Sequence, residues 1–328
     1  MKHISILVTR NSLIAAIGNA RYMFSSVNTF LEESGMSHRF DVQLVGVSDE
    51  IALDSGIYTI QADTTISELK NTDLILIPPV SGDVSESVVL NKEFIPWIKQ
   101  QYQNGAQVAS LCVGAFLLAA TGLLDNKLCS THWSSVNKFR ASFPQVRLVN
   151  KVLTDDKGVY TSGGANSYWN LLIYLVGKFT NHEIAIRTGK YFEVDLDRES
   201  QSPYSIFEGS RFHEDESIHK VQEYIERHFQ EALNLELLAE IAQLGERTFQ
   251  RRFKNATKLT AISYIQKTRV EAARKLLEQD NLTVSEIMYD VGYNDPEAFR
   301  KIFKRETNLT PMQYRSKYQE RKESTLPA

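Results

Sequence analysis

The sequence predicts two domains: an α/β domain at the N-terminal end and an all-α domain with two helix-turn-helix units at the C-terminal end. At 328 residues the chain is longer than one ordinary domain. Strand-like and helical segments alternate as far as about residue 195, which is typical of a mostly parallel sheet with helices on both faces. From residue 217 onward the spacing of apolar residues is helical, and one stretch occurs twice at an offset of 50 residues.

The α/β pattern begins at the first residues of the chain. Short apolar runs rich in Ile and Val are typical of the buried strands of a parallel sheet. They predict strands at residues 3–9, 40–47, 58–61, 74–77, 107–111, 144–155 and 159–161. Helical spacing predicts helices at residues 15–33, 91–104, 113 to about 122, and 165–178. A domain of about 190 residues is large enough to bury such a core.

The two patterns are separated by a polar segment. It contains Ser202-Pro203 and then Gly209-Ser210, which are residues typical of connections between domains. We therefore expect a first domain at residues 1–195, a linker at 196–216 and a second domain at 217–322. The tail at residues 323–328 is expected to be disordered.

The duplicated stretch aligns residues 237–264 with residues 287–314. The alignment places Leu237 on Ile287, Leu238 on Met288, Ile241 on Val291, Phe249 on Phe299 and Phe253 on Phe303. Each copy has a short helix, a tight turn and a second helix with Phe at positions i and i+4. This arrangement is typical of a helix-turn-helix.

The charge of the chain is strongly uneven. The net charge of −3 would argue against a nucleic-acid partner if it were spread evenly. However, residues 246–275 carry nine Lys and Arg against two Glu, and residues 300–322 carry eight against two. The positive charge thus lies in the same part of each copy, in the second helix and in the residues directly after it.

This pattern favours binding to the major groove of double-stranded DNA, where a helix reaches the hydrogen-bonding edges of the bases. With the Phe pairs inside, the side chains expected to face DNA are Arg247, Thr248, Gln250, Arg251, Lys254, Glu297, Ala298, Arg300, Lys301 and Lys304. Arg252 points partly away and is expected to hold a phosphate or to be structural. Two such helices on one connecting helix could enter groove segments about 34 Å apart. The alternative is a helical repeat that contacts proteins through solvated basic faces.

The two copies differ at the start of the second helix. Copy two offers Asp295 as a cap and Pro296 at the first helical position, whereas copy one has Gly245. Copy one has the richer set of base-reading side chains, Arg247, Gln250 and Arg251. We expect copy one to supply more of the sequence discrimination and copy two to supply a firm anchor.

A longer motif in copy two is Val291-Gly292-Tyr293-Asn294-Asp295-Pro296-Glu297-Ala298-Phe299-Arg300-Lys301-Ile302-Phe303-Lys304, followed by Leu309-Thr310-Pro311 and Tyr314-Arg315. With this motif the C-terminal domain resembles the AraC/XylS family of transcription regulators over residues 217–318. The resemblance implies two helix-turn-helix units, major-groove binding and promoter regulation. This chain departs from the family pattern at Asn308, Gly245, Lys258 and Ala261, so that copy one is expected to be the less rigid half.

The N-terminal domain has one candidate for covalent chemistry, Cys112. It stands between a predicted strand and a predicted helix, which is the context of a nucleophile elbow. The helix N-terminus is expected to lower the pKa of the thiol, and His132 could act as its base. The alternative is a small buried cysteine under a helix start, with Gly114 allowing close approach.

The stretch from Cys112 to Asp125, together with Thr131-His132-Trp133, resembles the ThiJ/PfpI branch of the class I glutamine-amidotransferase-like fold. The resemblance covers about residues 1–195 and implies a flavodoxin-like sheet with Cys112 at the elbow. Asn170 stands where relatives often carry an acid, and residues 11–19 contain no Asp or Glu. A nucleophile needs a base and the base needs an orienting group, so these departures count against catalysis.

Three interpretations of this domain remain: a degenerate pocket that senses a small molecule, a purely structural or dimerising domain, and a cysteine-dependent hydrolase or amidase. The candidate ligand-binding residues are Cys112, Val113, His132 and Trp133. No ligand spacing supports a metal site at Cys112, Cys129 and His132, and no cofactor is expected.

The expected partners are promoter DNA, an unknown small-molecule effector and a second copy of the chain in a homodimer, with RNA polymerase as a further candidate. A ligand near Cys112 would act on the second domain through residues 195–216. The sequence shows no signal peptide or membrane span, and two cysteines make no disulfide framework. We therefore expect a cytoplasmic protein.

Overall fold

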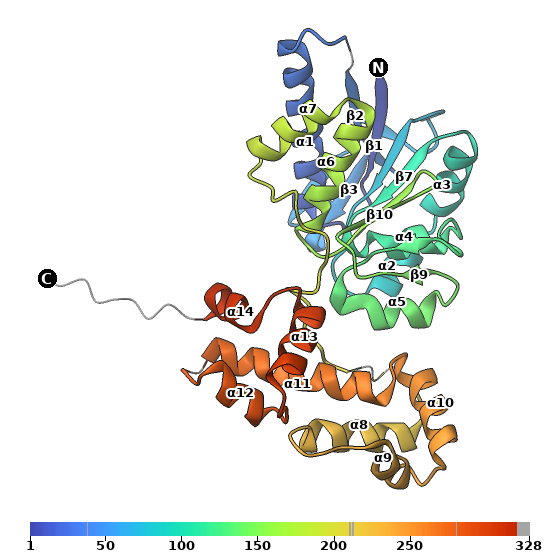
Figure 1. Ribbon diagram of the computed structural model, residues 1–328. Coiled ribbons are helices and arrows are strands. Elements are labelled where there is room, and N and C mark those ends of the chain that lie inside the picture. The colour runs from blue at the N-terminus through green and yellow to red at the C-terminus, as the bar shows by residue number, and fades with distance from the viewer. Residues whose placement is uncertain (38, 210, 212, 280, 320–328) are drawn as a thin grey trace, which may run out of the picture. The chain divides into compact units, whose positions relative to one another are not determined.

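The computed structural model describes residues 1–319 except 38, 210, 212 and 280. The chain divides into two compact units, Met1–Gln201 and Ser202–Ala328 (Figure 1). The tail expected at residues 323–328 lies outside the described residues, as do residues 320–322 of the expected second domain and residues 210 and 212 of the expected linker.

The first unit is built on a seven-stranded sheet with the order β10-β11-β7-β6-β1-β2-β5. Its strands are β1 (Lys2–Leu7), β2 (Phe40–Gly46), β5 (Thr64–Thr65), β6 (Leu74–Ile77), β7 (Gln107–Ser110), β10 (Leu153–Asp156) and β11 (Val159–Ser162). Neighbouring strands are parallel except β10 and β11, which pair antiparallel across a tight turn. The predicted mostly parallel α/β fold is confirmed.

Helices cover both faces of this sheet (Figure 1). One face carries α1 (Ile14–Glu33), α6 (Ser167–Phe179) and α7 (His182–Tyr191). The other carries α2 (Val84–Leu90), α3 (Phe94–Gln103), α4 (Ala115–Ala120) and α5 (Val136–Ser142). Because side chains alternate along a strand, Leu74 and Leu76 of β6 enter one core while Ile75 and Ile77 enter the other. Burial on both faces explains the unbroken apolar runs in the sequence.

Several predicted boundaries in this unit are wrong. The strand expected at 144–155 is two short strands, β9 (Arg147–Leu148) and β10, and β9 pairs with β8 (Leu128–Cys129) outside the main sheet. The helix expected at 91–104 begins at Phe94, after the unpredicted α2, whose first turn is capped by Asp83. The strand expected at 58–61 is β4 (Tyr58–Gln61), and it pairs outside the main sheet with β3 (Glu50–Leu53). The sequence did not predict β3 or α7.

The described part of the second unit is all-helical, as predicted. Its helices are α8 (Glu216–His228), α9 (Leu235–Ile241), α10 (Glu246–Thr257), α11 (Ala261–Gln279), α12 (Val284–Asp290), α13 (Pro296–Thr307) and α14 (Pro311–Tyr318). They form two separate cores, each around one Phe pair. The long helix α11 contributes Tyr264 and Ile265 to the first core and Val270 and Leu277 to the second. The predicted pair of helix-turn-helix units, α9–α10 and α12–α13, is confirmed.

The duplication holds at the level of single hydrogen bonds. The Thr257 hydroxyl donates to Phe253 O at 2.8 Å, and the Thr307 hydroxyl donates to Phe303 O at 2.8 Å. The next residues in the chain, Lys258 and Asn308, both have left-handed backbone, with φ of 62° and 60°. Each second helix thus ends with the same geometry.

The offset of 50 residues is wrong for the first helix of each copy. Helix α9 is capped by Asn234 and α12 by Thr283, which are 49 residues apart. The buried Leu238 therefore corresponds to the buried Ile287 and not to Met288. Copy two has one more residue in its turn, where Gly292 has a φ of 84°. The Phe pairs dominate the alignment, and this one-residue difference is therefore hidden in the sequence.

Candidate nucleic-acid interface and the Cys112 site

The second helices of the two copies, α10 and α13, begin differently. Asp295 caps α13 by accepting a hydrogen bond from the Glu297 N–H at 2.9 Å, with Pro296 at the first position. Gly245 precedes α10 and supplies no side-chain cap. A missing cap costs about 1 kcal/mol, although Gly is the least harmful replacement. Phe249, Phe253, Phe299 and Phe303 are at most 1% exposed, so both helices have a fixed inner face.

The outer faces of α10 and α13 carry basic and polar side chains that are available to a partner. Seven of them are exposed and form no hydrogen bond or ion pair with another residue among those described: Arg247, Gln250, Arg251, Lys254, Arg300, Lys301 and Lys304. Glu297 is also exposed, while Thr248 and Ala298 occupy equivalent half-buried positions. The structure therefore places all ten predicted positions on two equivalent helices.

The other basic residues in the same region are held by the protein itself. Arg252 donates from Nε and from a terminal nitrogen to the two oxygens of Asp215, at 2.8 and 2.7 Å. The side-chain hydrogen bond from Arg252 lowers the pKa of Asp215, which also caps α8. Of the two roles expected for Arg252, the structural one is observed.

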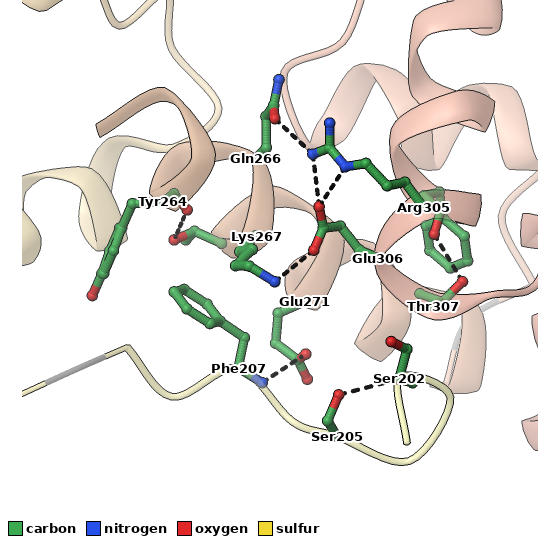
Figure 2. A network of polar contacts seen from close by, with 12 residues as sticks. Ser202, Ser205, Phe207, Tyr264, Gln266, Lys267, Glu271, Arg305, Glu306 and Thr307 are labelled. Carbon is green, nitrogen blue, oxygen red and sulfur yellow. Dashed lines mark hydrogen bonds and ion pairs between the residues drawn. The ribbon is translucent and has the colours of Figure 1, made fainter. Parts of the chain in front are cut away.

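A second set of charges joins α13 to α11. Figure 2 shows Glu306 between Lys267, whose Nζ is 2.5 Å away, and Arg305, which also donates to Gln266 at 2.8 Å. Burial alone would raise the pKa of Glu306, but Lys267 and Arg305 lower it. Counting charges along the sequence could not separate the cations that bind carboxylates of the protein from those that are available to a partner. It counts Lys267 and Arg305 together with the cations that have no protein partner among the described residues.

In the first unit, Cys112 lies two residues after the end of β7 and starts a short helical turn, as the elbow pattern predicts. Its backbone is left-handed with a φ of 55°, and its N–H donates to the Ser162 hydroxyl at 3.2 Å. The Thr131 hydroxyl donates to Cys112 O at 3.2 Å. A Cβ atom on Gly114 would lie 2.7 Å from Ile77 O and Pro78 O, so this turn requires glycine for close packing.

The thiol of Cys112 is poorly suited to act as a nucleophile. It is 6% exposed, and burial raises its pKa to about 11. The Val113 N–H at the start of the helix does lower the pKa, as expected, but desolvation of the thiolate is the larger effect, so the net change is a rise. Burial likewise raises the pKa of Cys129 to about 12.

His132 has no acidic partner among the described residues. Its Nδ1 lies 2.7 Å from the Ser134 hydroxyl, and its ring is 5.3 Å from that of Trp133. Burial lowers the pKa of His132, which disfavours the charged form of the ring. His132, Trp133 and Val113 are all half-buried.

Asn170 and Asn19, at the positions where the sequence lacks an acid, direct their amides to other groups. The Asn170 amide donates to Asp195 O at 2.6 Å. The Asn19 amide donates to the Tyr168 hydroxyl at 2.7 Å, and this hydroxyl is close enough to Cys112 to interact electrostatically. Neither contact supplies a base or an orienting carboxylate.

Gln201 is a residue of this site that sequence reasoning missed. Its side chain is buried beside His132, and its Oε1 accepts a hydrogen bond from the Gly164 N–H at 2.6 Å. It lay inside the polar segment interpreted as a linker, where nothing in the sequence signals burial.

Two absences hold for the described residues. No group of three or more His, Cys, Asp or Glu that could hold a metal ion occurs among them. No helix in the described part of the chain is both long and apolar enough to cross a membrane.

These geometries define a protein with an α/β unit and a unit of two helix-turn-helix motifs. Residues 238–317 match a helix-turn-helix domain family, and residues 24–178 match the DJ-1/PfpI family. The chain therefore joins a DJ-1/PfpI domain to an AraC-type helix-turn-helix domain, as the resemblances implied.

Relatives share this architecture. The HTH-type transcriptional regulator CdhR of Pseudomonas aeruginosa is 24% identical over 265 residues, which is 80% of this chain and 78% of CdhR. The HTH-type transcriptional regulator GlxA of Rhizobium meliloti is 26% identical over 208 residues, 63% of this chain and 64% of GlxA. A crystal structure of a ThiJ/PfpI family protein from Pseudomonas syringae has the same fold, with a TM-score of 0.50 and 16% identity over 74% of this chain and 88% of that one.

Proposed function

We propose that this protein is a sequence-specific DNA-binding transcription regulator. The observation that carries the proposal is that the cations of α10 and α13 fall into two groups, those bound to carboxylates of the protein and those without a protein partner among the described residues. Arg251 and Lys304 point outward with no protein partner among the described residues, while their neighbours Arg252 and Arg305 are bound by carboxylates. Cations that have no protein partner and lie on the outer face of two equivalent helices suit phosphates and base edges in the major groove. The regulators CdhR and GlxA support the same assignment.

The two recognition helices have different tasks in this proposal. Helix α10 exposes Arg247, Gln250 and Arg251, which can make bidentate hydrogen bonds with bases, and it supplies more of the discrimination. Helix α13 is capped at both ends and anchors the complex through Arg300, Lys301 and Lys304. Thr248, Lys254, Glu297 and Ala298 complete the two contact surfaces.

The N-terminal unit acts as a sensor or dimerisation domain and not as an enzyme. The buried Cys112 thiol has a raised pKa, and His132 has no orienting acid among the described residues. A small-molecule effector would bind around Cys112, Val113, His132 and Trp133. The protein would work in the cytoplasm as a homodimer on promoter DNA, with RNA polymerase as a further partner.

The test is a measurement of affinity for genomic DNA fragments selected by the full chain, at a series of salt concentrations. A regulator that neutralises several phosphates loses affinity linearly in log[salt], with a slope of about −0.9 per phosphate. Lys301→Ala and Lys304→Ala should each reduce the slope by about 1. Lys99→Ala, on the exposed side of α3, is the matched control. A flat salt dependence, or equal affinity for all sequences, would refute the proposal.

A cysteine-dependent hydrolase fused to a DNA-binding domain is the second candidate, because DJ-1/PfpI proteins include enzymes. It requires an ionised thiol at neutral pH. Rapid modification of Cys112 at pH 7 would favour it over the sensor.

A further inference from the structure

A polar niche in the N-terminal unit is filled by the chain's own Gln201. The side-chain nitrogen of Gln201 donates to Thr131 O at 3.0 Å, to Lys151 O at 3.3 Å and to the Ser130 hydroxyl at 3.2 Å. Its oxygen accepts from the Gly164 N–H at 2.6 Å. Both the nitrogen and the oxygen of the Gln201 amide are therefore hydrogen-bonded within the protein. The residue is only 2% exposed.

The walls of the niche are shaped for this group. A Cβ atom on Gly163 would overlap the carboxamide of Gln201, so a larger residue there would push the carboxamide out of its place. A Cβ atom on Gly164 would lie 3.4 Å from His132 Cδ2. The niche thus adjoins one of the candidate ligand-binding residues.

The next residue in the chain, Ser202, belongs to the second unit and is held there. Arg274 of α11, itself 5% exposed, donates to Ser202 O at 2.7 Å and also to Ser205 O. Glu271 accepts from the Phe207 N–H at 3.2 Å (Figure 2). The segment 202–207 is therefore clamped to the helix that connects the two helix-turn-helix motifs.

Residues 201 and 202 are consecutive, and consecutive Cα atoms are about 3.8 Å apart. The niche therefore holds the residue directly before the clamped segment. We propose that the niche is a binding site for a primary carboxamide, that Gln201 is its internal ligand, and that an effector offering the same group displaces Gln201 from it. The proposal deepens the sensing role and rests on it.

The niche selects its ligand by hydrogen-bond polarity. A carboxylate would direct acceptors at the carbonyls of Thr131 and Lys151, whereas a primary amide donates to both and accepts from Gly164. A tethered side chain has an effective concentration of the order of mM. An effector must therefore add contacts of its own, for which His132 and Trp133 are available.

The test uses the full chain without DNA and follows hydrogen exchange at the Gly164 amide by NMR. Gln201→Ala should speed Gly164 exchange by about tenfold or more. Gln100→Ala, at an exposed position of α3, should leave this exchange rate unchanged. Gln201→Glu should behave as Gln201→Ala, because its carboxylate mismatches the niche.

Propionamide is the probe of the ligand class. Added to Gln201→Ala, it should restore protection at Gly164, whereas propionate should not. Unchanged Gly164 exchange in Gln201→Ala, or no protection by propionamide, would overturn the proposal. Since these readouts contain no DNA, they can fail while salt-dependent DNA binding stands, and the reverse also holds.

Discussion

Glu306 on α13 and Lys267 on α11 form an ion pair, with Oε2 and Nζ 2.5 Å apart. It ties the second recognition helix to the helix that connects the two copies. Copy one has Ala256 at the position of Glu306, so it lacks this tie, and its recognition helix is held instead by Arg252 against Asp215. The two copies therefore have the same backbone design but are fixed by different charges.

The Lys267–Glu306 pair predicts a pH dependence of stability. Although burial raises the pKa of Glu306, Lys267 and Arg305 bring it below the ordinary 4.5. A carboxyl group with a lowered pKa in the folded state contributes its full stability above pH 4.5 and loses it as the pH falls through the folded value. Glu306→Gln should cost about 1.5–3 kcal/mol of unfolding free energy at pH 7 and remove that part of the acid dependence. Equal acid dependence in both proteins, measured by urea unfolding, would contradict this role.

Arg251 and Arg252 are adjacent, but replacing them with alanine should have different effects, one on DNA binding and the other on stability. Arg251→Ala should weaken binding to the preferred site by about 1–3 kcal/mol, with little change in thermal unfolding. Arg252→Ala should lower the unfolding temperature, because Asp215 loses both of its hydrogen bonds from Arg252. Binding assays and calorimetry on the two variants separate base reading from scaffolding. A large affinity loss with unchanged stability in Arg252→Ala would show that the assignment is wrong.

Cys112 is expected to be a slow nucleophile. With a pKa of about 11 against 9.0 for an ordinary thiol, alkylation by iodoacetamide at pH 7 should be on the order of 100-fold slower than for a free thiol, and burial slows it further. The rate should rise with pH toward 11. Cys112→Ser identifies the contribution of Cys112, and the urea-unfolded chain provides the unhindered reference rate. Rapid labelling of Cys112 in the folded chain would contradict the expectation that its thiol reacts slowly.

Two glycines of the first unit allow a comparison of how an added methyl group changes the stability of that unit. Gly114→Ala should destabilise the unit by about 1–3 kcal/mol, since the added methyl group meets backbone oxygens at 2.7 Å. Gly18 lies in α1 with nothing within 4 Å of an added Cβ. Gly18→Ala should therefore stabilise by about 0.5–1 kcal/mol. Thermal unfolding of both variants gives the comparison, and a neutral Gly114→Ala would show that the turn can relax.

The sequence predicted the elements whose pattern is set by burial on one or two faces. The strand at Leu74–Ile77 and the helix with Phe299 and Phe303 are examples, because their apolar periodicity is unambiguous. It failed where the backbone is fixed by tertiary contacts, as in α7 and in the split of residues 144–155. The carbonyl of Glu199 accepts a hydrogen bond from Val152 N–H, a contact 47 positions apart that no local pattern contains.

Of the candidate sites, the sequence alone determined the two basic recognition helices and the turn that carries Cys112, because residue types at helical and strand spacing encode them. Only the tertiary structure decided which charges are free: Arg252 binds Asp215 at the start of α8 and Arg305 binds Gln266 on α11, whereas Arg251 and Lys304 have no partner among the described residues. It also decided the direction of the Cys112 pKa, which depends on desolvation by the surrounding core and not on the turn. The burial of Gln201 was decided in the same way, because its four partners lie 37 to 71 positions away in the chain.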